Sequence, residues 1–591
     1  WPVSSAAEFT VVAEKMKSYE AGENFGNWRN RITLIADDEN HSNSLPERQH
    51  TEDSERLADV YIPAQFDLDK IYAVDYPFGT GGEKPEVREA IIRNINSGTL
   101  IVNYVGHGNP NVWADERIFR RTQDIPRLSN RDKLPLIFNA SCSIGFFDDP
   151  LLEGMAEDFL SYAAGGAIGT VSATRLVYSR PNAEFNKTAF YYLLGDYDFT
   201  VAEATYVAKL VRQNLGQQTN DRKYIYIGDP LTRLGFAPLK IDFATFSPDS
   251  LVALTVTELA GAVRDPNGVL QSEFDGTVDI SVLDNERERV FQFPPFTDSV
   301  TYSEYGPAVY RGKVAVTAGE FELKFVVPKD ITYGGRKARI SGYASDGVTG
   351  AAGYIYPIAI GGINTEVTDT TGPEIIAYFA GDPNLADGAN VSSGTEVTLE
   401  LFDSLGINLS GEIGHTIDLL IDDDPALTYV LNEDFSYNPG SYQAGVATMK
   451  LPGLTTGPHT LKVKAWDSAN NSSQLELAFN IGEQAGLEIS ELLCYPNPVQ
   501  ESCEFSYYLS RTANEVALKI FTLSGLEIYV QEGLPRTAGY HGGIHWSGYD
   551  ADGDRPANGV YIFQLSAQTL DSGVDVDDNK VTANEKLIIM K

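Results

Sequence analysis

Two residues with the chemistry of a thiol enzyme each follow a short apolar stretch. His107 comes directly after the stretch 100–105, and Cys142 comes shortly after the stretch 134–138. A thiol becomes a strong nucleophile only when it is deprotonated, and a neighbouring imidazole accepts its proton and stabilises the thiolate. If both stretches are adjacent parallel strands, their ends hold the two side chains at one edge of a sheet. The pair therefore predicts nucleophilic catalysis, with Cys142 as the nucleophile and His107 as its base.

A third apolar stretch, 31–36, ends in a run of acids, Asp37, Asp38 and Glu39. A carboxylate at a third strand end is well placed to orient the His107 ring and to favour its protonated form. This pattern predicts that one of the three acids is a member of the site, and it leaves open which one.

Glycines flank the histidine at positions 106 and 108. Glycine lets a substrate chain come close to the backbone, and backbone N–H groups can stabilise a developing oxyanion. We expect the N–H groups of Gly108 and Cys142 to form such an oxyanion hole.

Each of these residues also has an ordinary structural interpretation. A single cysteine after a strand is often a buried small hydrophobe, a histidine beside glycine is often a loop residue, and an acidic run is often solvated. The coincidence of all three at strand ends of one sheet favours the catalytic interpretation.

Residues 1–238 show apolar strands that alternate with helical patterns. The predicted helices are 7–19, 84–97 and 151–164, and the predicted strands are 31–36, 100–105, 134–138 and 167–171. This alternation predicts an α/β domain with a parallel sheet and helices on both faces. In such sheets the chemistry collects at the carboxyl ends of the strands.

After residue 238 the pattern changes to short alternating strands between Gly, Asp, Asn and Pro turns, such as 277–282 and 396–401. This predicts all-β sandwich domains. Polar or glycine-containing stretches near 364 and 485 suggest the boundaries. The resulting multidomain prediction is an α/β domain at 1–238, a β-sandwich at 239–364, an Ig-like sandwich at 365–484 and a C-terminal β domain at 485–591.

The composition limits the classes of function. The chain has 591 residues, enough for several domains, and 82 acidic against 45 basic residues give a net charge of -37. Such a charge disfavours binding to nucleic acid or anionic lipid and suits an exported protein. The chain opens on Trp1 and Pro2, without an initiator Met or a signal peptide, so we expect further residues, including an export signal, to precede it.

The other two cysteines, Cys494 and Cys503, flank the turn 495–498. A hairpin there would bring them within bonding range, so a disulfide and two free thiols are both open. No metal ligands are predicted. His541 and His545 are four residues apart, but the glycines between them do not suit a helix.

The N-terminal segments resemble the gingipain-like cysteine peptidases. The matching segments are 103–108 with 113–114, 134–142 and the closing strand 226–230. The resemblance implies a caspase-like sheet, a Cys142/His107 dyad, Glu39 as the acidic member, and no cofactor. It also implies that part of the catalytic domain lies before residue 1.

The C-terminal segments 494–498, 520–525, 558–562 and 586–591 are similar to the sorting domains of type IX secretion cargo. The segments 403–408, 414–417 and 464–467 resemble the sortases of that system. The resemblance implies an enzyme of the cell surface that removes sorting domains from secreted cargo and attaches the cargo to anionic lipopolysaccharide. It further implies an outer-membrane β-barrel partner (PorV-like) that the C-terminal domain docks on.

Three functions from different classes remain open: a sortase, a secreted gingipain-like protease that degrades host proteins, and a surface adhesin that has lost activity. The intact Cys142/His107 pair disfavours the adhesin. The first two share a mechanism and differ in the acceptor, which is an amine for the sortase and water for the protease.

Overall fold

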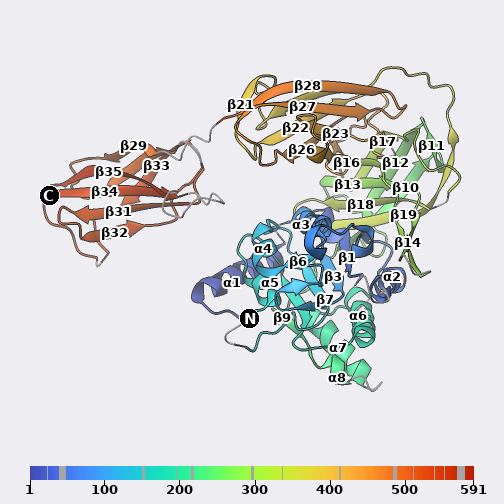
Figure 1. The fold of residues 1–591 in the computed structure, drawn as a ribbon, viewed down its shortest axis with the longest axis horizontal. Coiled ribbons are helices and arrows are strands. Elements are labelled where there is room, and N and C mark those ends of the chain that lie inside the picture. The colour runs from blue at the N-terminus through green and yellow to red at the C-terminus, as the bar shows by residue number, and fades with distance from the viewer. Residues whose placement is uncertain are drawn as a thin grey trace. The chain divides into compact units, whose positions relative to one another are not determined.

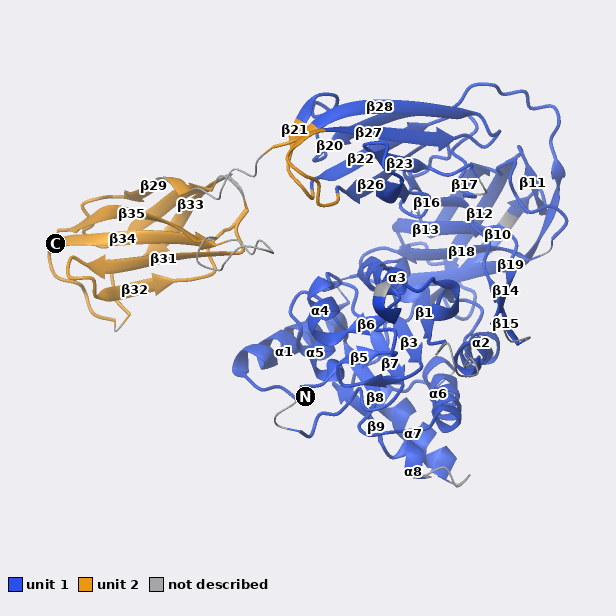
Figure 2. Cartoon of the chain, viewed as in Figure 1, with its two compact units in different colours: residues 1–389, 395–451, 459–479 blue, residues 390–394, 452–458, 480–591 orange. Residues whose placement is uncertain are grey.

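The computed structural model describes residues 1–591 except 23, 39–47, 150–152, 196, 214–217, 294–297, 336, 412–413, 483–488, 510–511, 538, 552, 569–579 and 591. The chain forms two compact units (Figure 2). Unit 1 comprises residues 1–389, 395–451 and 459–479, and unit 2 comprises residues 390–394, 452–458 and 480–591.

A six-stranded sheet forms the centre of the N-terminal part of unit 1 (Figure 1). In sheet order its strands are β2 (Asp67–Tyr72), β1 (Arg31–Ala36), β3 (Ile101–Val105), β7 (Leu136–Ala140), β8 (Gly169–Ala173) and β9 (Tyr224–Gly228). Nearly every residue of β1, β3, β7 and β8 is buried. That burial is the mark of a sheet covered on both faces.

The predicted all-parallel sheet is wrong at one edge. β9 runs antiparallel to β8, whereas the other neighbouring strands are parallel. After β8 the chain passes through helices and comes back to the carboxyl end of β8, where β9 begins. At this point Thr174 N donates to Lys223 O at 2.8 Å. A strand that starts beside the end of its neighbour must run the opposite way, and a hydrophobic pattern does not carry this information.

Helices cover both faces of the sheet. One face packs against α1 (Ala6–Ala21), α3 (Pro85–Ser97) and α5 (Met155–Ser161), and the other against α2 (Gln49–Tyr61), α6 (Ser179–Leu194) and α7 (Val201–Gln213). Alternate strand residues divide between the two cores, as the period of two in a strand requires: Leu136 and Phe138 lie in one core and Ile137 in the other.

Shorter elements complete this part of unit 1. They are the 3₁₀ turns at Asn27–Asn30, Ala73–Asp75, Thr80–Gly82 and Ile125–Arg127, a small sheet of β4 (Gly108–Asn109), β5 (Val112–Trp113) and β6 (Phe119–Arg120), and the one-turn helices α4 (Arg121–Asp124) and α8 (Gln218–Asp221).

The helix predicted over 151–164 is shorter than expected. α5 begins after Gly154, whose N–H donates to Glu157 Oε2 at 2.7 Å, so the Glu157 side chain caps the first turn. The predicted strand 134–138 lies two residues further along, as β7.

The segment 239–481 belongs to unit 1 except for residues 390–394, 452–458 and 480–481. Over this segment the chain forms strands joined by loops. They are β10 (Leu239–Ser247), β11 (Ser250–Ala253), β12 (Val256–Arg264), β13 (Gly276–Leu283), β14 (Arg287–Gln292), β15 (Ser299–Glu304), β16 (Ala308–Val316), β17 (Glu320–Val326), β18 (Ala338–Ser345), β19 (Gly350–Ile363), β20 (Glu374–Phe379), β21 (Ala389–Val391), β22 (Glu396–Phe402), β23 (Asp418–Ile421), β24 (Thr428–Val430), β25 (Ser436–Tyr437), β26 (Ala444–Lys450), β27 (Gly457–Trp466) and β28 (Ser472–Ile481). Among the described residues from 239 onward there is no α-helix, only a 3₁₀ turn at Pro425–Leu427.

One sheet crosses the predicted boundary at 364. It joins β10–β13 and β16–β19 to β20, β22, β25 and β26, through the pairing of Gly312 with Tyr437. The Tyr310 and Tyr437 rings stack at 5.0 Å beside this junction. The separate sandwiches, the Ig-like assignment and the caspase-like assignment stay predictions.

Unit 2 contains two sheets that share one hydrophobic core. β29 (Ile489–Tyr495), β30 (Cys503–Leu509) and β33 (Gly539–Trp546) form the first. β32 (Glu527–Gln531), β31 (Glu515–Thr522), β34 (Gly559–Gln568) and β35 (Lys580–Ile589) form the second. The rings of Phe505 and Phe563 meet between the sheets at 4.9 Å.

All three cysteines are free thiols. Cys494 and Cys503 lie close enough for their side chains to hydrogen-bond. That hydrogen bond, together with burial, raises the pKa of the Cys494 thiol. Of the two states that the sequence left open, the structure therefore shows the free thiols.

Candidate active site

Cys142 and His107 follow equivalent positions of two hydrogen-bonded parallel strands. In the register of β3 and β7, Val105 pairs with Ala140, and each of the two residues comes two positions later. Both side chains are partly exposed, whereas the strands that lead to them are buried. The sheet therefore brings the predicted nucleophile and base to one carboxyl edge, where β8 also ends.

The loop after β8 surrounds the sulfur of Cys142. The N–H of Val177 donates to Cys142 Sγ at 3.4 Å, and the carbonyl oxygen of Val177 lies 3.4 Å from the same sulfur. A donor of this kind stabilises a thiolate, and the carbonyl accepts the proton of a neutral thiol. Ser143, the next residue, has a φ of 53°, which turns the chain sharply away from the strand.

The backbone of His107 is held from several sides. Its N–H donates to Asp37 Oδ2 at 3.0 Å, and its carbonyl accepts from the Tyr104 hydroxyl and from Ala114 N, the latter at 2.9 Å. Tyr104 is itself fixed by stacking on Trp113 at 4.6 Å. The position of the base is therefore set by strand β1, strand β3 and the β4–β5 hairpin together.

His50 is a neighbour that sequence reasoning missed. It is buried near the start of α2, and its ring meets the His107 ring edge-on at 5.3 Å. The segment around His50 gave no strand-end signal, because its contact with His107 depends on how α2 packs on the sheet.

The glycines beside His107 make close contacts that leave no room for a side chain. A Cβ at Gly106 would lie 2.3 Å from Asp37 Cβ, and a Cβ at Gly108 would lie 2.7 Å from Ser141 Oγ. The histidine and cysteine loops thus touch through Gly108 and Ser141. The sequence predicted these glycines for substrate access. The structure shows in addition that the close packing around them requires residues without a side chain.

The predicted oxyanion donors are the N–H groups of Gly108 and Cys142. In the β4–β5 hairpin, Gly108 lies opposite Trp113. The ladder hydrogen bond beside this pair runs from Ala114 N to His107 O, so Gly108 and Trp113 form a pair without hydrogen bonds between them. The N–H of Gly108 therefore points away from β5. The oxyanion role of both groups stays a prediction.

Glu39, the predicted acidic member, lies outside the described residues. Of the two acids before it, Asp37 accepts hydrogen bonds from His107 N and from Asp38 N. Asp38 pairs with Lys84 Nζ at 2.6 Å, and both side chains are buried. Burial raises the pKa of Asp38, and the Lys84 charge opposes this effect.

A third acid, Glu116, joins these two. One oxygen each from Asp37, Asp38 and Glu116 lie within 4.8 Å of one another. Burial, with the charge of Asp37, raises the pKa of Glu116 from 4.5 to about 7. This acidic group adjoins the His107 loop, because Asp37 accepts a hydrogen bond from His107 N.

Exposed apolar side chains lie beside the thiol. Leu176 and Tyr178, on either side of Val177, are strongly exposed, and Phe147 is exposed in the loop after Cys142. Arg175 ties the two loops together through paired hydrogen bonds to Asp148 at 2.9 and 2.7 Å. This edge offers apolar surface to a substrate chain.

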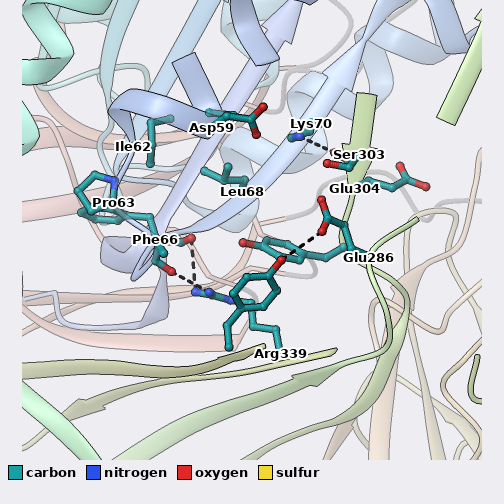
Figure 3. Close-up of a pocket in the computed structure, with 14 residues that line it drawn as sticks. Asp59, Ile62, Pro63, Phe66, Leu68, Lys70, Glu286, Ser303, Glu304 and Arg339 are labelled. Atoms are coloured by element: carbon teal, nitrogen blue, oxygen red, sulfur yellow. Dashed lines mark hydrogen bonds between the residues drawn. The ribbon is translucent and has the colours of Figure 1, made fainter. Parts of the chain in front are cut away.

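A separate cavity of about 270 Å³ lies between the α2–β2 region and residues of β15, β18 and β19, with Glu286 just before β14 (Figure 3). Three of its charged groups form ion pairs: Lys70 with Glu55, Arg339 with Asp67, and Glu286 with Lys337. Arg339 also donates to the carbonyls of residues 64–66. The residues that line this cavity belong to neither the Cys142 loop nor the His107 loop.

In the part of the chain that the structure describes, none of the helices combines the length and the apolar character needed to cross a membrane.

Comparisons with known proteins give the following matches. Residues 1–235 match the model of Peptidase family C25. The chain is 25% identical to dimeric latent PorU from Porphyromonas gingivalis, with a TM-score of 0.30, over 72% of this chain and 41% of that chain. It is 15% identical to the Arg-specific cysteine proteinase gingipain R (RGPB), with a TM-score of 0.33, over 61% of this chain and 74% of that chain. Curated proteins give no match. Over residues 1–235 the chain is therefore similar to peptidase family C25, the gingipain family of cysteine peptidases.

Proposed function

We propose that this chain is a cell-surface endopeptidase and transpeptidase, a sortase of the PorU type in type IX secretion. The observation that carries the catalytic part is the register of β3 and β7, which places His107 and Cys142 at matching positions of one sheet edge. The sorting-domain motifs of the C-terminal segments support the type IX assignment.

In the first half-reaction, His107 accepts the proton of Cys142 and the thiolate attacks the carbonyl carbon of a cargo peptide bond. The C–S bond forms, and the carbonyl oxygen becomes an oxyanion that accepts hydrogen bonds from Gly108 N and Cys142 N. When the intermediate collapses, the C–N bond breaks and protonated His107 gives its proton to the leaving amine. The C-terminal sorting domain leaves, and the cargo stays on Cys142 as a thioester.

In the second half-reaction, an amine of anionic lipopolysaccharide attacks the thioester carbonyl. His107 takes a proton from the amine and returns it to the departing thiolate, so the enzyme is restored. The product carries a new amide bond at the cargo's C-terminus. Attack by water would give a free carboxylate instead, and the enzyme would then be a protease.

The chain's own geometry supports the acylation step through two groups. Val177 N–H donates to Cys142 Sγ, the atom that attacks the substrate in this proposal. Asp37 holds the backbone of His107, and we assign Glu39 the orientation of the ring.

Mass spectrometry of cargo C-termini tests the proposal, in cells that express the wild-type chain or Cys142→Ala. We expect shortened C-termini in amide linkage to a glycolipid amine with the wild type, and intact sorting domains with the variant. Shortened C-termini that all end in a free carboxylate would assign the protease function, and identical cargo in both strains would reject both functions.

A further inference from the structure

The backbone contacts of His107 fix where the residue lies but not how its ring is turned. Asp37 accepts from the N–H of His107, and the carbonyl of His107 accepts from the Tyr104 hydroxyl and from Ala114 N. None of these contacts reaches the imidazole, which must turn a ring nitrogen toward the Cys142 sulfur to take its proton. Rotation about the side-chain bonds of His107 therefore has to be limited by other neighbours.

The ring of His50 supplies such a contact. His50 belongs to the first turn of α2 and is 2% exposed. Its ring meets the ring of His107 edge-on, with the two centroids 5.3 Å apart and the two planes at 83°. Aromatic rings at this distance and angle are in the edge-to-face arrangement, in which each ring limits the rotation of the other.

The beginning of α2 is polar although it is buried. His50, Thr51 and Ser54 are each 2% exposed or less, whereas the apolar side chains that α2 buries, Leu57 and Ala58, lie in its second half. A helix that served only to cover the sheet would bury apolar residues along its whole length. The polar residues come at the end of α2 that contacts the His107 ring.

Neighbouring elements hold this end of α2 in place. Arg48, which directly precedes the helix, donates to the Ser299 carbonyl of β15 at 3.3 Å. Lys187 of α6 pairs with Asp53 at 2.9 Å, and both of these side chains are largely buried. His50 lies between the two anchored residues in the sequence, so the helix presents its ring to His107 from a fixed position.

We propose that His50 is a positioning residue, which holds the His107 imidazole in the orientation that faces Cys142. This role rests on the dyad chemistry proposed above. The acid assigned at Glu39 would hydrogen-bond the same ring, whereas His50 limits its rotation by packing. Because His50 is too deeply buried to contact a substrate, it acts only through His107. Packing of this kind needs a flat ring but no proton, so another aromatic ring can replace His50.

The test compares His50→Ala with His50→Phe in the full chain. Cys142 is alkylated with iodoacetamide and followed by peptide mass spectrometry, which separates it from Cys494 and Cys503. Alkylation proceeds through the thiolate, so its rate reports how well His107 receives the proton. We expect His50→Ala to lower the rate about tenfold or more, and His50→Phe to stay within about threefold of the wild type.

His50→Asn is the second variant, and it serves if His50→Ala does not fold. It removes the ring but keeps a polar side chain beside Thr51 and Ser54, and it should be slowed as much as His50→Ala. Cleavage of a cargo peptide gives a further measurement. Without the ring, kcat should fall about tenfold or more while KM changes less than about twofold, because His50 acts on the chemical step.

Leu57→Ala is the matched control. It opens a cavity beneath the same helix, about two turns away from His50, and should lower the melting temperature at least as much as His50→Ala. Its alkylation rate and its kcat should stay within about threefold of the wild type. A loss of rate with Leu57→Ala that equals the loss with His50→Ala would mean that general loosening of α2 causes the effect.

The proposal is also overturned if His50→Ala and His50→Asn keep the wild-type rate, or if His50→Phe is as slow as they are. His107→Ala separates these outcomes from a failure of the dyad. If His107→Ala is slow while the His50 variants match the wild type, only the role of His50 is rejected. If His107→Ala is alkylated as fast as the wild type, His107 is not the base, and the proposed function is rejected together with this inference.

Discussion

At the scale of single residues, the chemistry depends on a few backbone contacts. Val177 approaches the sulfur of Cys142 with both its N–H and its carbonyl, and Asp37 and Tyr104 hold the backbone of His107. These partners come from strands β1 and β3 and from the loop after β8. A rigid sheet thus carries two reactive side chains whose own surroundings remain partly open to substrate.

Cys142→Ala should lower kcat for cargo cleavage at least about 10³-fold, because the nucleophile is removed. The free energy of unfolding should change by less than about 1.5 kcal/mol, since the side chain is small and only partly buried. Cleavage assays and urea unfolding of purified protein measure the two quantities.

Cys494→Ala is the matched control, because it removes a free thiol from unit 2. It should keep full activity. A folded Cys142→Ala protein that still cleaves cargo at the wild-type rate would show that another residue is the nucleophile.

At the scale of elements, the sequence predicted best the strands whose residues are buried without interruption. β1 was predicted at its observed bounds, and the strand-end positions of His107 and Cys142 followed from the apolar stretches before them. The sequence could not show the direction of β9, the contact of His50 with His107, or the burial of Glu116 beside Asp37 and Asp38. Each of these depends on contacts between segments far apart in the chain, and a local pattern carries no trace of such contacts.

Gly108→Ala should lower kcat about tenfold or more, because its Cβ would lie 2.7 Å from Ser141 Oγ and force the two catalytic loops apart. Adding Ser141→Ala removes that oxygen and should restore most of the activity. Steady-state kinetics of the single and double variants measure the effect.

Gly362→Ala is the control for adding a methyl group, since a Cβ there meets nothing within 4 Å. Its kinetics should match the wild type. If the double variant were as impaired as Gly108→Ala, the contact with Ser141 would not be what separates the loops.

Asp403, just after β22, should make stability depend on pH. Burial, with repulsion from Asp467 and Asp369, raises the pKa of Asp403 from 3.8 to about 6. The folded state therefore holds the proton more tightly than the unfolded chain. The protonation of Asp403 stabilises the folded state fully below about pH 4. This stabilisation is lost as the pH rises through about 6, and the total loss in free energy of unfolding is about 3 kcal/mol.

Asp403→Asn keeps the oxygen that accepts from Leu405 N at 2.7 Å and removes the charge. As the pH rises from 5 to 7, the free energy of unfolding of the wild type should fall by about 1 kcal/mol relative to that of this variant. Urea unfolding in the presence of chelator measures the difference. The exposed Glu374→Gln on β20 should follow the wild type, and a parallel pH profile for Asp403→Asn would contradict the assignment.

At the scale of the whole molecule, the chain joins a peptidase to a separate β unit. Unit 2 has its own hydrophobic core between two sheets, with β32 and β35 as the edge strands of the second sheet. Leu523 and Leu526, at the turn between β31 and β32, are exposed. An exposed edge strand is a surface on which a partner protein can add a strand.

We propose that residues 485–591 dock the enzyme on an outer-membrane partner protein and remain on the mature chain. With a net charge of -37, the chain is repelled by anionic lipopolysaccharide, so retention at that surface requires a protein contact. The sorting-domain motifs lie in this segment, and its core is separate from that of the peptidase.

Deletion of residues 485–591 should release the chain from the outer membrane and stop cargo processing in cells. The purified truncated chain should still cleave a cargo peptide, because Cys142, His107 and the sheet that carries them belong to unit 1. Cell fractionation and peptide cleavage together measure both effects. Membrane retention of the truncated chain, or a mature wild-type chain that lacks this segment, would contradict docking and favour a secreted protease.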